Sequence, residues 1–321
     1  MEHVVAGEYD MALHAFAQVL KVYKAQYGTE AHPLIASAYH NLGTVHSKRA
    51  SLLMEHTVHQ RHCQEQALLC FQAAARSARD STELGPDHPN VAVSLVRIGF
   101  LLLQSRQYSN AITTFQEALR IRISHFGQQH GLVANLYNNL GVCQMHLGEF
   151  QNGRKSLQLA LDIQRNNNNA SFENTTAQLE LADTLCNIGG LCLEWIRRQG
   201  PHPVHAQDAE VAFLEAMEIR TKVLGSNDPL VLQVRSLHDM VRSIPLPTPS
   251  PRTASPALLS VSSPTPAPKE ATPESLVYSW TPRTASYHND QSNEDEDSAL
   301  KMTPPNAATT TNNAALSLPQ L

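Results

Sequence analysis

The sequence contains no run of 18 apolar residues, no excess of basic residues and no leader-like N-terminus. Without a long apolar run, no membrane-spanning helix is expected. A formal net charge of −5 argues against nucleic-acid binding, which normally requires a basic surface. The first nine residues, MEHVVAGEY, lack the basic start and apolar core of a signal peptide. We therefore expect a cytoplasmic protein without a membrane span and without nucleic-acid partners.

Catalytic motifs are missing as well. The sequence has no glycine-rich phosphate loop, no Gly-x-Ser-x-Gly elbow and no His-Glu-x-x-His pair. Its five cysteines follow no disulfide framework, which favours reduced, buried thiols in the cytosol. These absences predict a protein that is not an enzyme and holds no cofactor.

One group of residues has the spacing of a metal site. His56, His59 and Cys63 are three and four residues apart, so on a helix they would lie on one face, where they could share a zinc ion. Structural zinc sites in loops usually carry paired cysteines, however, and here there is only one. Histidine is also an ordinary polar residue on an exposed helix. We therefore expect no metal, and keep these three residues as the alternative.

Glycine and proline divide the chain into two parts. All 14 glycines lie at or before Gly225, whereas 13 of the 19 prolines lie at or after Pro245. Residues 1–242 are regularly amphipathic. Residues 243–321 are rich in Pro, Ser, Thr and Asn and have few large apolar side chains, so they cannot bury enough surface to offset chain entropy. The sequence predicts one folded domain, 1–242, and a disordered tail, 243–321.

A block of small and apolar residues recurs through the first part. Its copies are Ala36–Tyr39–Leu42–Gly43, Ala92–Leu95–Ile98–Gly99, Ala134–Tyr137–Leu140–Gly141 and Ala182–Leu185–Ile188–Gly189. Each is followed by a second block: Ala67–Phe71–Ala74, Ala111–Phe115–Ala118, Gly153–Leu157–Ala160 and Ala209–Phe213–Ala216. Both spacings fit one face of a helix with 3.6 residues per turn. Recurrence at a fixed period, 42 residues from Gly99 to Gly141, predicts stacked helical hairpins rather than an ordinary bundle.

The unit is not uniform along the chain. Residues 44–84 contain neither glycine nor proline, so the extra length there is expected in two lengthened helices. At the start, an unpartnered copy, Ala12–Phe16–Val19, follows Gly7-Glu8-Tyr9, which matches Gly148-Glu149-Phe150 at the end of a first helix. The first repeat is therefore expected to lack most of its leading helix. Either the chain is a piece of a longer protein, which we favour, or something covers the apolar residues at that end.

These repeats resemble the tetratricopeptide repeat, in the 42-residue form found in kinesin light chains and nephrocystin-like proteins. The matching segments are Gly85-Pro-Asp-His-Pro-Asn-Val-Ala, Asn139-Leu-Gly141, Gly148-Glu-Phe, Ala118-Leu-Arg-Ile and Phe126-Gly127. The resemblance covers about residues 1–240 and implies an all-α, right-handed α-solenoid of about five helix-turn-helix repeats. Kinesin light chains also carry a heptad coiled coil ahead of their repeats, and this sequence has no such heptads.

In proteins of this kind the first helices line a concave groove that holds an extended peptide. Here we call the glycine at the end of each first block the repeat glycine. The residues two and six positions before each repeat glycine lie away from the apolar stripe. They include the groove candidates Asn41, Arg97, Asn135, Asn139, Asp183 and Asn187, together with Ser37 and Val93. Asparagine can pair with a peptide backbone in either direction, and arginine can pair with a carboxylate. The alternative is a set of merely solvated polar positions, but three asparagines among the four residues two before a repeat glycine favour the groove.

The tail carries two copies of a short phrase, Pro251-Arg-Thr-Ala-Ser255 and Pro282-Arg-Thr-Ala-Ser286. Arginine three residues before serine suits a basophilic kinase, which makes Ser255 and Ser286 phosphorylation candidates. Composition alone can produce such patterns in a Pro/Ser/Thr-rich segment. The one aromatic run, Leu276–Trp280, could dock into the groove of its own chain.

Together these features predict a cytoplasmic adaptor that binds protein partners through extended peptide segments. Association with the cytoskeleton is left open. Recruitment of a cargo or complex, as in kinesin light chains, is the first hypothesis. A co-chaperone or assembly scaffold ranks lower, because holding a terminal carboxylate needs several cations in the groove and only Arg97 is evident. A third hypothesis is the regulatory repeat region of a larger enzyme.

Overall fold

The computed structural model describes residues 2–53, 57–168 and 174–245, and all regular structure within these ranges is α-helical. The ten helices are α1 (Glu2–Tyr27), α2 (Pro33–Leu52), α3 (Val58–Asp80), α4 (Pro89–Gln104), α5 (Tyr108–Phe126), α6 (Gly131–Leu147), α7 (Phe150–Asn168), α8 (Thr175–Gln199), α9 (Pro203–Leu224) and α10 (Pro229–Arg242). The predicted all-α architecture is confirmed.

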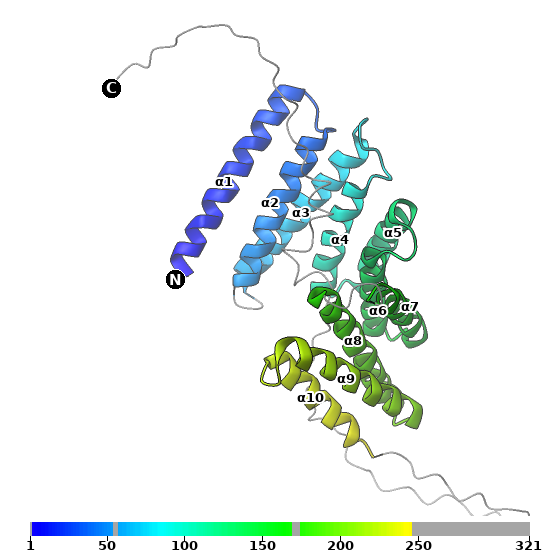
Figure 1. Cartoon of the computed structure of the whole chain (residues 1–321). Coiled ribbons are helices and arrows are strands. Elements are labelled where there is room, and N and C mark those ends of the chain that lie inside the picture. Colours follow the sequence, from blue (N-terminus) through cyan, green and yellow to red (C-terminus); the bar gives the residue numbers. More distant parts are fainter. Residues whose placement is uncertain (1, 54–56, 169–173, 246–321) are drawn as a thin grey trace, which may run out of the picture.

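The helices are arranged as a row of hairpins. Each helix packs against the next one along the chain, and α6 also contacts α8 directly. Figure 1 shows the hairpins along a curved path, with α1 at one end and α10 at the other. Contacts limited to neighbouring units are the property that defines a solenoid. The hairpins α2–α3, α4–α5, α6–α7 and α8–α9 are the four complete repeats, and α1 and α10 lie beyond them.

Glycine and a bulky apolar side chain hold each hairpin together. A Cβ atom added at Gly99 on α4 would lie 2.4 Å from Cε1 of Phe115 on α5, so only glycine lets the ring lie against the α4 backbone. Phe115 is fully buried there. The same contact recurs in the other three hairpins as Gly43–Phe71, Gly141–Leu157 and Gly189–Phe213. The two recurring blocks of the sequence are therefore the two sides of one contact.

Histidine and aspartate begin the first helices. Nδ1 of His32, His88 and His130 accepts a hydrogen bond from the backbone N–H two residues on, at 3.1–3.2 Å. Asp228 accepts the same bond from the Leu230 N–H at 2.8 Å. Proline follows three of these four caps, at a position where its missing N–H has no helical partner to lose. The His88-Pro89 junction thus begins α4.

The lengthened helices expected around residues 44–84 are confirmed, because α2 and α3 have 20 and 23 residues, whereas α4 and α5 have 16 and 19. The prediction for the first unit is wrong in one respect: α1 runs without a break through Gly7, Glu8 and Tyr9. Gly148 ends α6 because it takes the left-handed conformation, with φ of 80°, and its N–H bonds back to the preceding turn. Gly7 lies inside a helix instead, so the shared triplet does not impose a turn.

Two further expectations concern the thiols and the membrane. The five cysteines are free, and all but the half-buried Cys70 are buried, as predicted. Within the described ranges, no helix is both long enough and apolar enough to cross a membrane.

Candidate peptide-binding site

The predicted groove residues divide into two groups by exposure. Asn41, Arg97, Asn135 and Asp183 are half-buried on α2, α4, α6 and α8. Asn139 and Asn187 were expected to be exposed, but only 1% and 0% of their surface is accessible. That expectation is wrong, and an extended peptide cannot pair with these two amides unless the helices around them move.

The burial of Asn187 has a structural reason. Its Nδ2 donates a hydrogen bond to Oδ1 of Asn138 at 2.9 Å, which joins α8 to α6. Asn138 lies three residues before its repeat glycine, next to the predicted position, and is fully buried. The equivalent residue on α4 is Val96, which offers Asn139 no such partner. Asn138 and Asn187 thus join neighbouring repeats, a role that the pattern of single helices does not reveal.

Asp183 is engaged in an ion pair. Its carboxylate bonds to the guanidinium of Arg220, which is almost completely buried on α9. Arg220 Nη1 also donates to the backbone carbonyl of Leu230 at 3.3 Å, where α10 begins. Arg122 makes the same bond to the Leu132 carbonyl at 3.1 Å in an earlier repeat. Both arginines lie four residues after the last alanine of their second block. This recurrence is visible in the sequence and could have indicated their shared role.

Asn135 is engaged as well. Its Nδ2 donates to Oε1 of Glu180 at 3.3 Å, a second polar link between α6 and α8. Burial raises the pKa of the Glu180 carboxyl to about 7; the bond from Asn135 opposes this shift, and the nearby Asp183 carboxylate adds to it. Near neutral pH Glu180 therefore carries its proton in a large fraction of the molecules.

Arg97 differs from these residues. It forms no hydrogen bond or ion pair with any residue in the ranges that the structure describes, although it is half-buried on α4. Its positive charge is felt by His40 on α2, whose pKa is lowered to about 3, chiefly by complete burial and further by Arg97. His40 is therefore neutral and adds no positive charge, so Arg97 is the cation of this pair that is available to an anion.

Several predicted sites stay untested. His59 is exposed and Cys63 is buried on α3, while His56 lies outside the described residues, so the alternative zinc site remains a prediction. Ser255, Ser286 and the Leu276–Trp280 segment also lie outside the described residues.

The pKa of Glu180 leads to a pH prediction. Up to about pH 7 the folded chain keeps the Glu180 proton, whereas the unfolded chain loses it near the ordinary value of 4.5. Between these values the folded state binds more protons than the unfolded state, so stability falls as pH rises. The glutamine in Glu180→Gln cannot ionise. Between about pH 5 and about pH 8, the free energy of unfolding of this variant should therefore rise by roughly 1–3 kcal/mol relative to that of the wild type, at about 1.4 kcal/mol per pKa unit.

Urea unfolding of both chains at the two pH values measures this gain. Taking the difference between the chains cancels the opposite trend from His40, because both chains contain that residue. A difference that does not change with pH would show that Glu180 ionises normally in the folded chain.

Comparisons with known proteins find a repeat family and similar solved structures. The tetratricopeptide repeat family model matches residues 92–122 and 134–167, which cover α4–α5 and α6–α7. No curated protein sequence matches the chain. Among solved structures, BtubC (BKLC) from P. vanneervenii is similar at 14% identity and a TM-score of 0.41, covering 79% of this chain and 99% of its own. A kinesin light chain from Podospora anserina with nearly identical TPR-like repeats has 13% identity and a TM-score of 0.42, covering 74% and 87%.

The matched repeats share two features with the hairpins on either side of them: the contact between a glycine and a bulky apolar side chain, and the capped first helix. The chain contains tetratricopeptide repeats, which the family model matches in α4–α5 and α6–α7.

Proposed function

We propose that the chain is a non-enzymatic scaffold whose first helices bind an extended peptide, with Arg97 as the partner of an acidic side chain. The observation that carries the proposal is a half-buried arginine that has no anion among the described residues. A guanidinium forms two parallel hydrogen bonds with a carboxylate, and such bonds strengthen where water is partly excluded. Asn135, Asp183 and Asn187 on these helices already have intramolecular partners.

The residues around Arg97 favour an internal acidic side chain over a C-terminal carboxylate. A terminal carboxylate would need several cations on the first helices, and Arg97 is the single cation among the eight residues two and six before the repeat glycines. The finer proposal, recruitment of a cargo or complex in the cytoplasm as in kinesin light chains, rests on the 42-residue form of the repeat.

Arg97→Glu should weaken the binding of acidic peptides by more than about tenfold, since a charge-assisted hydrogen bond contributes about 1.5–3 kcal/mol and repulsion replaces it. Neutral peptides should be affected much less. The measurement is fluorescence anisotropy of the full chain against a panel of acidic and neutral peptides that contain aromatic residues.

Arg76→Glu is the matched control. Arg76 is exposed on α3, a second helix, so the substitution makes the same charge change on a different surface. Equal losses for both variants would indicate a general effect of net charge. Unchanged binding in Arg97→Glu would move the partner site away from the first helices.

A further inference from the structure

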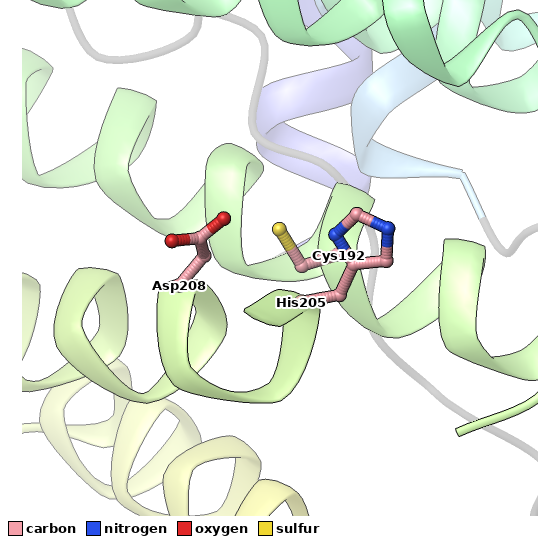
Figure 2. Close-up of side chains that lie close together, drawn as sticks. All are labelled: Cys192, His205 and Asp208. Carbon is pink, nitrogen blue, oxygen red and sulfur yellow. The ribbon is translucent and has the colours of Figure 1, made fainter. Parts of the chain in front are cut away.

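A cysteine, a histidine and an aspartate meet in the last complete hairpin. Cys192 comes from α8, while His205 and Asp208 lie one turn apart on α9 (Figure 2). The ligand atoms of the three side chains all lie within 4.8 Å of one another, and Cys192 is 1% exposed. They come from both helices of the hairpin, beside α7, whose Arg154 lies 2.7 Å from Asp208.

We propose that this hairpin binds one zinc ion through Cys192 Sγ, a ring nitrogen of His205 and the Asp208 carboxylate. Thiolate, imidazole and carboxylate are the ligands that zinc takes in proteins, and three of them leave a fourth tetrahedral position for water. The site is independent of the proposed peptide surface, which is built on the first helices around Arg97.

Two polar atoms of this cluster are buried without a hydrogen bond. Nδ1 of His205 and Oδ2 of Asp208 are buried and have no hydrogen-bond partner. Arg154 Nη2 forms an ion pair with Oδ2 at 2.7 Å, although the two atoms are not aligned as a hydrogen bond. Buried polar atoms are normally paired, because an unpaired one costs free energy. A metal ion between the two side chains would give His205 Nδ1 the partner that it lacks and would bind the carboxylate that Arg154 already orients.

Two other hairpins of the chain have different residues at the positions of Cys192, His205 and Asp208. In α4–α5 the equivalent positions are Leu102, Gln107 and Asn110, and in α6–α7 they are Gln144, Glu149 and Asn152. In both hairpins the asparagine amide donates to the side chain one turn before it, at 3.0 and 3.1 Å. Aspartate has no amide to donate, so Asp208 cannot make this bond to His205. In α8–α9 the pair found in these two hairpins is replaced by two metal ligands facing a thiol.

Neighbouring side chains hold the ligands in place. The His205 ring stacks on the Trp195 ring, with the two centroids 4.1 Å apart. The centroid of the His202 ring lies 4.8 Å from that of His205. Arg154 holds the Asp208 carboxylate from α7. Residues that orient metal ligands in this way contribute strongly to metal affinity.

A cysteine beside a histidine and an aspartate could also suggest a nucleophile. Burial, with a smaller contribution from Asp208 and against a lowering by Arg154, raises the pKa of the Cys192 thiol to about 12, so almost no thiolate exists at neutral pH without a metal ion. Zinc changes this balance: the S–H proton is released to solvent as the S–Zn bond forms. His205, whose pKa is lowered chiefly by burial, is already in the neutral form that binds a metal.

The test uses the full chain, freed of metal with a chelator and then titrated with Co²⁺ and Zn²⁺. Bound Co²⁺ should give a thiolate-to-metal charge-transfer band and the visible bands of a four-coordinate ion, and Zn²⁺ should abolish both and raise the melting temperature. Ions held only by surface histidines give no charge-transfer band, which matters in a chain with 16 histidines.

Cys192→Ala should remove the band and lower zinc affinity by more than about 100-fold, beyond the 10–100-fold typical of residues that only orient a ligand. Cys143→Ala is the matched control: Cys143 is fully buried on α6, and burial raises its pKa to about 12 as well. Should Cys192→Ala fail to fold, His205→Asn serves as a second variant and should shift the visible bands and weaken zinc. Absence of the band in the wild type, its survival in Cys192→Ala, or its equal loss in Cys143→Ala would overturn the proposal.

Discussion

Phe115→Ala is expected to lower the free energy of unfolding by about 3–5 kcal/mol, the usual cost of removing a core aromatic ring. Phe115 is fully buried between α4 and α5, where its ring lies against Gly99 and meets Phe100 edge to face at 5.6 Å. Since Gly99 has no side chain to fill the space, the backbone can close the cavity only by shifting the two helices. Urea denaturation followed by circular dichroism measures the loss.

Leu159→Ala is the control for this prediction. Leu159 lies on α7 with 46% of its surface exposed, so its truncation leaves no cavity and should change stability by less than about 0.5 kcal/mol. An unchanged unfolding midpoint in Phe115→Ala would mean that the helix faces are assigned wrongly.

Asp183→Ala should also cost about 3–5 kcal/mol, although its side chain is close to the surface. The substitution leaves the Arg220 guanidinium buried, with the Leu230 backbone carbonyl as its remaining hydrogen-bond partner among the described residues. A buried charge that loses its counter-ion is far more costly than a missing surface ion pair. Thermal and urea unfolding of the variant measure the effect.

A double variant separates the ion pair from simple truncation. Replacing both partners, as Asp183→Leu with Arg220→Met, removes the buried charge and should recover most of the lost stability, because apolar residues of similar volume often replace a buried ion pair without loss. If Asp183→Ala changed stability by less than about 0.5 kcal/mol, Asp183 would be free to contact a partner, as the sequence pattern first indicated.

The sequence predicted the fold well because the fold is repetitive. One contact, glycine against an aromatic or leucine side chain, recurs in four hairpins, so its residues recur at one period and their phase fixes which face is buried. The match of Gly7–Tyr9 to the end of a first helix was misleading, because it rests on a single short triplet. Gly148 ends α6 because its left-handed conformation lets its N–H bond to carbonyls of the last helical turn. A matching triplet elsewhere in the sequence does not show whether a helix ends there.

The site was predicted less well because it depends on contacts between repeats. Helical periodicity places Asn139 and Asn187 on a polar face, but it cannot tell whether α4, α6 and α8 lie close enough to cover that face. Asn187 is covered because Asn138 of the neighbouring repeat accepts its hydrogen bond. Cys192 and His205 were likewise too far apart in sequence to be associated, although His205 and Asp208 have the spacing of a shared helix face.

A charge swap tests the acidic-peptide site most directly. From the peptides that bind the full chain, one is chosen whose acidic residue is essential, and that residue is replaced by lysine. The swapped peptide should bind Arg97→Glu more tightly than it binds the wild type, while the original peptide shows the reverse order, because only a direct contact exchanges both charges without loss. If the swapped peptide bound the wild type and Arg97→Glu equally weakly, Arg97 would not contact the acidic side chain, and the proposed site would be wrong.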